Sequence, residues 1–155
     1  MQVLWVITWY ISANTGNEEN SCHKRKRQPE LSNDQPPREV LRFREKIRQS
    51  DGVLICTPEY VFSLPAGLKN ALEWCVSSEV FAGKPAALIT AAASGDKGHE
   101  ALQLIMQTLM ARFTPGTTLL IKGIRSKVDE AGNIVDRQLE KRMIELIGLF
   151  DKEIS

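Results

Sequence analysis

Short apolar segments alternate with amphipathic segments along most of this chain of 155 residues, and this alternation constrains its fold more than any other feature. Continuously apolar runs of this length are typical of strands that are covered on both faces of a sheet. The predicted strands are Val3–Ile7 and residues 53–56, 86–90 and 117–121. Each of the last three is preceded by an amphipathic segment or a turn.

The amphipathic segments predict four helices. They cover Arg38–Gln49, a stretch capped by Ser63 that runs to about residue 76, residues 98–113 and residues 137–150. Their apolar positions predict a core of Val40, Phe43, Ile47, Leu64, Leu68, Leu72, Cys75, Leu102, Ile105, Met106, Leu109, Leu139, Met143, Leu146 and Phe150. Alternating strands and helices indicate one α/β domain with a parallel, doubly wound sheet.

Composition excludes several classes of protein. The net charge is only +1, whereas nucleic-acid binders usually carry a strong basic excess. No apolar run reaches the roughly 18 residues of a membrane span, and the first residues lack the basic start of a signal peptide. Three cysteines, none in a CxxC pair, fit reduced thiols. We therefore expect a cytoplasmic protein with no nucleic-acid or membrane partner.

The segment from residue 12 to residue 37 is rich in Asn, Gly and Pro, which predicts a loop. Such a long loop without regular structure is uncommon inside a compact domain. It contains a basic run, HKRKR, at residues 23–27. This run suits either a phosphate or nucleic-acid contact or a solvated loop, and the absence of basic excess elsewhere favours the loop.

Ligands of open α/β sheets bind beyond the carboxyl ends of the strands, so two loops are candidate sites. Residues 57–65 contain two aromatics and two prolines, a stiff apolar shelf that suits a planar ligand. Residues 91–98 (AAASGDKG) are small enough for a flat ligand to approach the backbone. Composition alone still favours the simpler alternatives, a rigid corner packed on a neighbour and a flexible turn.

Residues 57–74, TPEYVFSLPAGLKNALEW, closely resemble the signature stretch of NAD(P)H-dependent FMN reductases. This flavodoxin-like family includes quinone, azo-dye and chromate reductases. Residues 81–85, FAGKP, and the Ser/Gly-rich loop after the next strand match as well. The likeness runs from about Pro29 to the C-terminus and implies a flavodoxin-like, three-layer α/β/α fold.

The resemblance also implies a function. Such enzymes pass a hydride from NAD(P)H via FMN to a small acceptor such as a quinone or free flavin, and they are commonly homodimers or homotetramers. Because the flavin carries the redox chemistry, neither a catalytic side chain nor a metal ligand is expected. The residues implied to hold FMN are Pro58, Glu59, Tyr60, Val61, Phe62 and Ser63 in the first loop and Ala92, Ser94, Gly95 and Gly98 in the second.

The sequence departs from the family pattern at two places. Val61 stands where many members have Asn. The family's Gly-Ser-x-Arg phosphate loop, the helix after it and a second strand are not recognisable before Pro29. We therefore interpret residues 1–28 as divergent, poorly ordered or misread, and residues 29–155 as family-like. The alternatives are a non-catalytic or weakly flavin-binding relative that acts as an interaction protein, and a regulatory binder that uses the basic loop.

Three further residues have two interpretations each, and two cysteines have one. His99 is either a flavin or substrate contact or, as we prefer, a capping or surface histidine. Glu59 is either a proton donor or, preferably, a backbone contact with a solvated side chain. Lys69 suits a phosphate contact and a surface or intersubunit position equally. Cys56 and Cys75 lie at apolar positions and are expected to be inert core thiols.

Overall fold

The computed structural model describes residues 3–7 and 36–155, and the predictions made for residues 8–35 lie outside this part. Four parallel strands form one sheet in the order β1 (Val3–Ile7), β2 (Gly52–Thr57), β3 (Ala86–Ala92) and β4 (Thr118–Lys122). All four predicted strands are therefore confirmed. Their order does not reverse among the described residues, so the described sheet contains no topological switch point.

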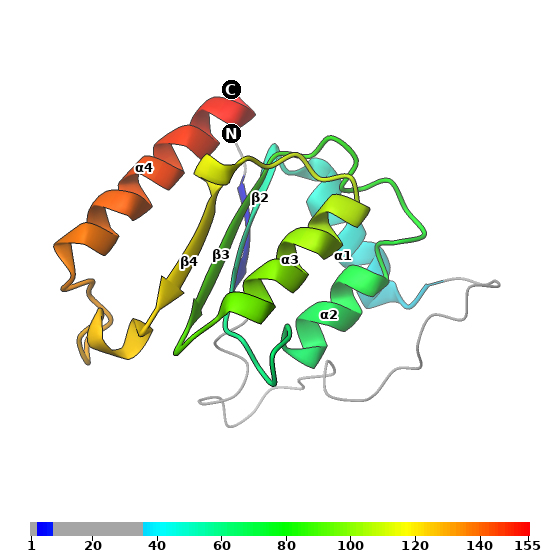
Figure 1. Cartoon of the computed structure of the whole chain (residues 1–155). Helices are drawn as coiled ribbons and strands as arrows, with labels where there is room; N and C mark the ends of the chain where they lie inside the picture. Colours follow the sequence, from blue (N-terminus) through cyan, green and yellow to red (C-terminus); the bar gives the residue numbers. More distant parts are fainter. Residues whose placement is uncertain (1–2, 8–35) are drawn as a thin grey trace.

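Helices cover both faces of this sheet (Figure 1). The helices α1 (Arg38–Gln49), α2 (Ala66–Glu73) and α3 (Asp96–Thr108) lie on one face, and α4 (Arg137–Ile154) lies on the other. Crossovers between parallel strands are almost always right-handed. Because each strand from β1 to β4 is added at the same side of the one before it, the helices that connect them all lie on one face. The result is the expected flavodoxin-like, three-layer α/β/α fold.

Two clusters of buried residues explain why the strands are continuously apolar. Alternate side chains of a strand point to opposite faces, so Ile55 and Leu88 join the cluster under α1, α2 and α3, while Leu54 and Ile89 join the cluster under α4. The helices contribute the residues predicted to point inward. Those that are buried are Ile47, Leu64, Leu68, Leu72, Cys75, Leu102, Met106, Leu109, Leu139, Leu146 and Phe150.

The predicted start of the second helix was wrong. Ser63 does not cap α2 but belongs to a tight turn before it, in which its backbone N–H and C=O groups bond with those of Tyr60. Pro65 is the N-cap residue instead, and α2 begins at Ala66 and ends at Glu73, three residues before the predicted end.

The third helix also differs from its prediction of residues 98–113. It begins at Asp96 and ends at Thr108. Met110 then takes a positive φ of 61°, which turns the chain back toward the sheet. Arg112 exchanges backbone hydrogen bonds with Lys84 and Ala86, so this stretch extends the edge of β3 rather than the helix.

The remaining boundaries shift by a few residues. β3 continues to Ala92, and α4 continues to Ile154, four residues beyond the prediction. A 3₁₀ turn covers Pro115–Thr117, so β4 starts at Thr118, and a second one covers Ile124–Ser126. Among the helices of residues 36–155, none combines the length and the apolar character that a bilayer span requires.

Candidate functional site

The loops that follow β2 and β3 begin side by side at the carboxyl edge of the sheet. Thr57 at the end of β2 pairs with Thr90 of β3, and both side chains are buried. From this edge the first loop runs outward. Its exposed tip consists of Tyr60, Val61 and Phe62, whose exposed fractions are 54%, 93% and 77%. Three neighbouring large apolar side chains thus face solvent beside the ends of the central strands.

The tip is held in a tight two-residue turn. The Tyr60 N–H donates to the Ser63 carbonyl at 2.9 Å, and the Ser63 N–H donates to the Tyr60 carbonyl at 3.0 Å. Val61 and Phe62 between them have φ values of 50° and 58°. This left-handed conformation is unfavourable for a β-branched residue, whereas Asn and Gly adopt it readily. Val61 therefore carries backbone strain at the position where the sequence pattern expects Asn.

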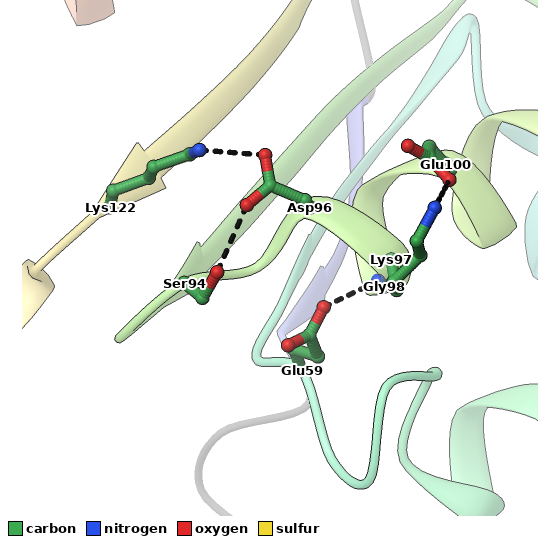
Figure 2. Close-up of polar contacts among 7 residues, drawn as sticks. All are labelled: Glu59, Ser94, Asp96, Lys97, Gly98, Glu100 and Lys122. Atoms are coloured by element: carbon green, nitrogen blue, oxygen red, sulfur yellow. Dashed lines mark hydrogen bonds and ion pairs between the residues drawn. The ribbon is translucent and has the colours of Figure 1, made fainter.

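The second loop is held from the side of β4. Lys122 at the end of β4 lies 2.7 Å from one carboxylate oxygen of Asp96, and the Ser94 hydroxyl donates to the other at 2.9 Å (Figure 2). These two hydrogen bonds, that of Lys122 foremost, lower the pKa of Asp96. The Gly123 N–H also donates to the Ala93 carbonyl at 3.1 Å. The loop before α3 is thus fastened to the strand beyond it.

One hydrogen bond joins the two loops. The Glu59 carboxylate accepts from the backbone N–H of Gly98 in the first turn of α3, at 2.6 Å (Figure 2). A Cβ atom at Gly98 would lie 3.0 Å from the Glu59 Cβ and 3.1 Å from its Cγ, so a larger residue would have to push the Glu59 side chain back by a few tenths of an ångström. The carboxylate is therefore a cap of α3, which neither interpretation of Glu59 from the sequence foresaw.

His99 lies at the same edge, in the first turn of α3. Its Nδ1 atom is 3.0 Å from the hydroxyl oxygen of Thr90, a residue that is completely buried. Burial lowers the pKa of His99, and the nearby Asp96 charge acts in the opposite direction. The imidazole is half-buried and hydrogen-bonded to Thr90, and both interpretations of His99 from the sequence stay predictions.

The two described cysteines lie in or beside the core. Cys75 is buried, and burial raises the pKa of its thiol to about 11. Cys56 in β2 is half-buried, and burial raises the pKa of its thiol as well. Because the thiolate is the reactive form, a raised pKa disfavours reactivity of both thiols at neutral pH.

The ten sequence-predicted site residues divide into an exposed set and a supporting set. Tyr60, Val61, Phe62 and Ser94 are exposed, and Glu59 and Ser63 are half-buried. The buried ones, which lie beneath the exposed surface of the two loops, are Pro58, Ala92, Gly95 and Gly98. Sequence reasoning missed Lys122 and Thr90, although Lys122 is a single cation at the end of an apolar run, where strand ends form the site edge.

These residues fit a flat, partly apolar ring such as that of a flavin. The tip offers apolar side chains, and the backbone N–H groups of Val61 and Phe62 make no hydrogen bond within residues 3–7 and 36–155. Free N–H donors next to an apolar surface match the carbonyl-bearing and apolar edges of such a ring. Over the same described ranges, no cluster of three or more His, Cys, Asp or Glu residues is arranged to hold a metal ion.

Comparison with known protein families shows to which family the chain belongs. The model of the NADPH-dependent FMN reductase family matches residues 14–122, more than half of the chain. The chain belongs to this family. The match covers α1, both loops and all of β2, β3 and β4, so the site described above lies inside the family region of this FMN reductase homologue.

Individual relatives agree with the family assignment. The chain is 35% identical over 128 residues to an NADH:(hydroxy)cinnamate reductase subunit of Vibrio ruber, an alignment that covers 78% of this chain and 61% of the relative. It is 36% identical over 123 residues to an NADPH:quinone oxidoreductase of Arabidopsis thaliana, covering 76% and 62%. The chain thus spans about three fifths of the length of these curated relatives.

A solved structure supports the fold. A flavoenzyme NAD(P)H:(acceptor) oxidoreductase from Paracoccus denitrificans superimposes with a TM-score of 0.59 at 19% sequence identity. The superposition covers 99% of this chain and 96% of that one. The two proteins share the arrangement of sheet and helices.

Proposed function

We propose that this FMN reductase family member is an FMN-dependent NAD(P)H oxidoreductase that passes a hydride from NAD(P)H via FMN to a small acceptor such as a quinone or free flavin. One observation carries the proposal: the two loops that resemble the family's flavin loops meet at the carboxyl edge of the sheet and are joined there by Glu59 and Gly98. The family match over residues 14–122 and the relatives named as reductases support the same activity.

In this proposal the two loops divide the work of binding. Tyr60, Val61 and Phe62 provide an apolar surface for the ring and backbone N–H donors for its polar edge. Ser94, in the second loop, lies on the opposite side of the ring from the tip. The residues that keep the backbones of the two loops in place are Pro58, Ser63, Ala92 and Gly95. FMN, when bound, supplies the hydride chemistry, and the protein contributes orientation and exclusion of water.

The test is a flavin titration followed by an assay of turnover. Purified protein is titrated with FMN by fluorescence quenching, and oxidation of NADH and NADPH is then measured with a quinone as acceptor. Saturable FMN binding and acceptor-dependent oxidation of the nicotinamide are expected. The absence of both would overturn the reductase function and is what a non-catalytic relative would give.

We further propose that the chain forms one cytoplasmic domain that assembles as a homodimer or homotetramer, with residues 1–13 outside the region that the family model matches. The exposed apolar tip at residues 60–62 supports assembly, because a contiguous apolar patch is a common mark of an interface. Light scattering after gel filtration measures the mass in solution. A mass equal to that of a single 17.4 kDa chain at micromolar concentration would overturn the oligomeric proposal.

A further inference from the structure

The N-cap residue of α3 makes no side-chain hydrogen bond to the first turn of the helix. The first backbone N–H groups of a helix have no partner within the helix and need an acceptor. The N-cap residue, Gly95, has no side chain to offer. The carboxylate of Asp96, the first residue of the helix, is held by Lys122 and Ser94 and also interacts with its own backbone N–H, so it leaves the Gly98 N–H to another acceptor.

Glu59 supplies the missing cap from a loop 39 residues away in the sequence. Its carboxylate accepts from the Gly98 N–H, and a negative charge at this end of a helix is also favoured by the helix dipole. A hydrogen bond to a charged group contributes more than a neutral one. Glu59 directly precedes the exposed tip. Its hydrogen bond to Gly98 therefore ties the N-terminal end of the tip to α3.

We propose that Glu59 is a positioning residue whose carboxylate, by capping α3 at Gly98, fixes the spacing of the two loops and thereby sets the affinity for FMN. The inference rests on the proposed function. The loop of β3 is fixed on its far side by Asp96 and Lys122, so the Glu59 contact determines where the tip lies relative to a fixed partner (Figure 2). Without that contact the tip samples positions that do not match the ring, and binding then includes the cost of ordering the tip.

Three variants test the inference. Glu59→Ala removes the acceptor and the charge, and we expect it to raise the dissociation constant for FMN about tenfold, the size of effect expected for one charge-assisted hydrogen bond. Glu59→Gln keeps an amide oxygen that accepts from the Gly98 N–H, so it should restore most of the affinity. Glu100→Ala removes a carboxylate from the same helix, where it makes only an exposed ion pair with Lys97, and should bind FMN like the natural protein.

Hydrogen exchange of the flavin-free protein provides an independent measurement. The amide of Gly98 should exchange faster in Glu59→Ala than in the natural protein and should be slowed again in Glu59→Gln. A general loss of structure in Glu59→Ala would accelerate exchange throughout α3 and β3, so exchange confined to the first turn identifies the loss of the cap itself.

The outcomes separate the inference from the function on which it rests. If the natural protein does not bind FMN, the proposed function fails and the inference fails with it. If the natural protein binds FMN and Glu59→Ala binds it equally well, only the positioning role is overturned. If the Gly98 amide exchanges at the same rate in both proteins, the cap does not hold the loop and the inference is again overturned.

Discussion

Val61 is the residue whose backbone conformation conflicts most with its side chain. It is β-branched, it has a φ of 50°, and its side chain is 93% exposed, so it gains little from packing. Non-glycine residues in this region cost on the order of 1–3 kcal/mol, and Asn is the residue that tolerates it best after Gly. We expect Val61→Asn to raise the free energy of unfolding by about 1 kcal/mol.

Urea denaturation of the flavin-free protein measures this change. Val76→Asn is the matched control, since Val76 is also an exposed valine, at 58%, but it lacks a positive φ. That variant should leave stability unchanged. A Val61→Asn protein no more stable than the natural one would show that the turn, held by Tyr60 and Ser63, imposes no strain on residue 61.

Gly95 is the second residue at which the backbone conformation restricts which amino acid fits, here glycine. Its φ is 89°, and a Cβ atom there would lie 2.7 Å from the Leu120 Cδ1 atom. Gly95→Ala should therefore lower the free energy of unfolding by about 1–3 kcal/mol. Gly67→Ala is the control, because a Cβ at this position in α2 meets nothing within 4 Å and alanine favours the helix. Equal stability of the two variants in urea would contradict the strain at Gly95.

At the residue scale the sequence revealed candidates but not contacts. The motif placed Glu59 in the right loop, because strand-to-helix loops of parallel sheets meet at one edge. It did not show that Glu59 caps α3, since this contact joins residues 39 apart and depends on Gly98 leaving space for the side chain. The bond between the side chains of His99 and Thr90, nine residues apart, was not foreseen either, because it depends on how α3 packs beside β3. Local patterns carry no information on which distant backbone group lacks a partner.

At the scale of single elements, α4 is capped by the side chain of its own N-cap residue, whereas α3 is capped by Glu59 from another loop. The Asp136 carboxylate accepts from the backbone N–H groups of Gln138 at 2.9 Å and Leu139 at 3.0 Å, and it pairs with Lys127. The Lys127 contact, followed by the Leu139 N–H, lowers the pKa of Asp136. Replacing an N-cap residue by alanine usually destabilises a protein of this size enough to lower its melting temperature by about 2–4 °C.

The effect of Asp136→Ala should depend on pH. Because the pKa of Asp136 is lower in the folded state, its contribution is fully present above the ordinary aspartate range and disappears as the pH falls through the folded-state pKa. Thermal unfolding at pH 7 should therefore separate the variant from the natural protein, and the gap should shrink below about pH 4. A gap that stays constant down to pH 2 would mean that the charge contributes nothing. Asp151→Ala, at the other end of α4, should not lower the melting temperature.

Strands were predicted better than helix ends, and the reason is physical. A strand buried on both faces must be apolar throughout, so its sequence shows its extent directly. Helix ends depend on contacts with other segments. The apolar stripe continues past Thr108, but Met110 turns the chain and Arg112 pairs with Lys84 beside β3. The prediction of residues 98–113 followed the stripe and missed this pairing.

At the scale of the whole molecule, two buried clusters share one sheet, and this should make unfolding a single event. Leu54 and Ile55 are neighbours in β2 yet belong to different clusters. The same strands therefore hold up both clusters, and loss of the helices on one face weakens the sheet on which the other face packs. Among the described residues α4 alone covers its face, and Phe150, with 4% exposure, is buried in that cluster. If the chain is one cooperative domain, a destabilising substitution at Phe150 also lowers the stability of the opposite layer.

Phe150→Ala is the corresponding test. Removing a buried phenylalanine side chain costs about 3–5 kcal/mol, whereas Ile144→Ala, on the same helix but 66% exposed, should change stability by no more than about 0.5 kcal/mol. Urea unfolding is followed by far-UV circular dichroism and by tryptophan fluorescence, which includes Trp74 just after α2 on the other face. Because β2, β3 and β4 belong to both clusters, Phe150→Ala should shift both transitions to lower urea by the same amount. A fluorescence transition that stays in place while the circular dichroism shifts would show that the two layers unfold separately, and the chain would then not be one cooperative domain.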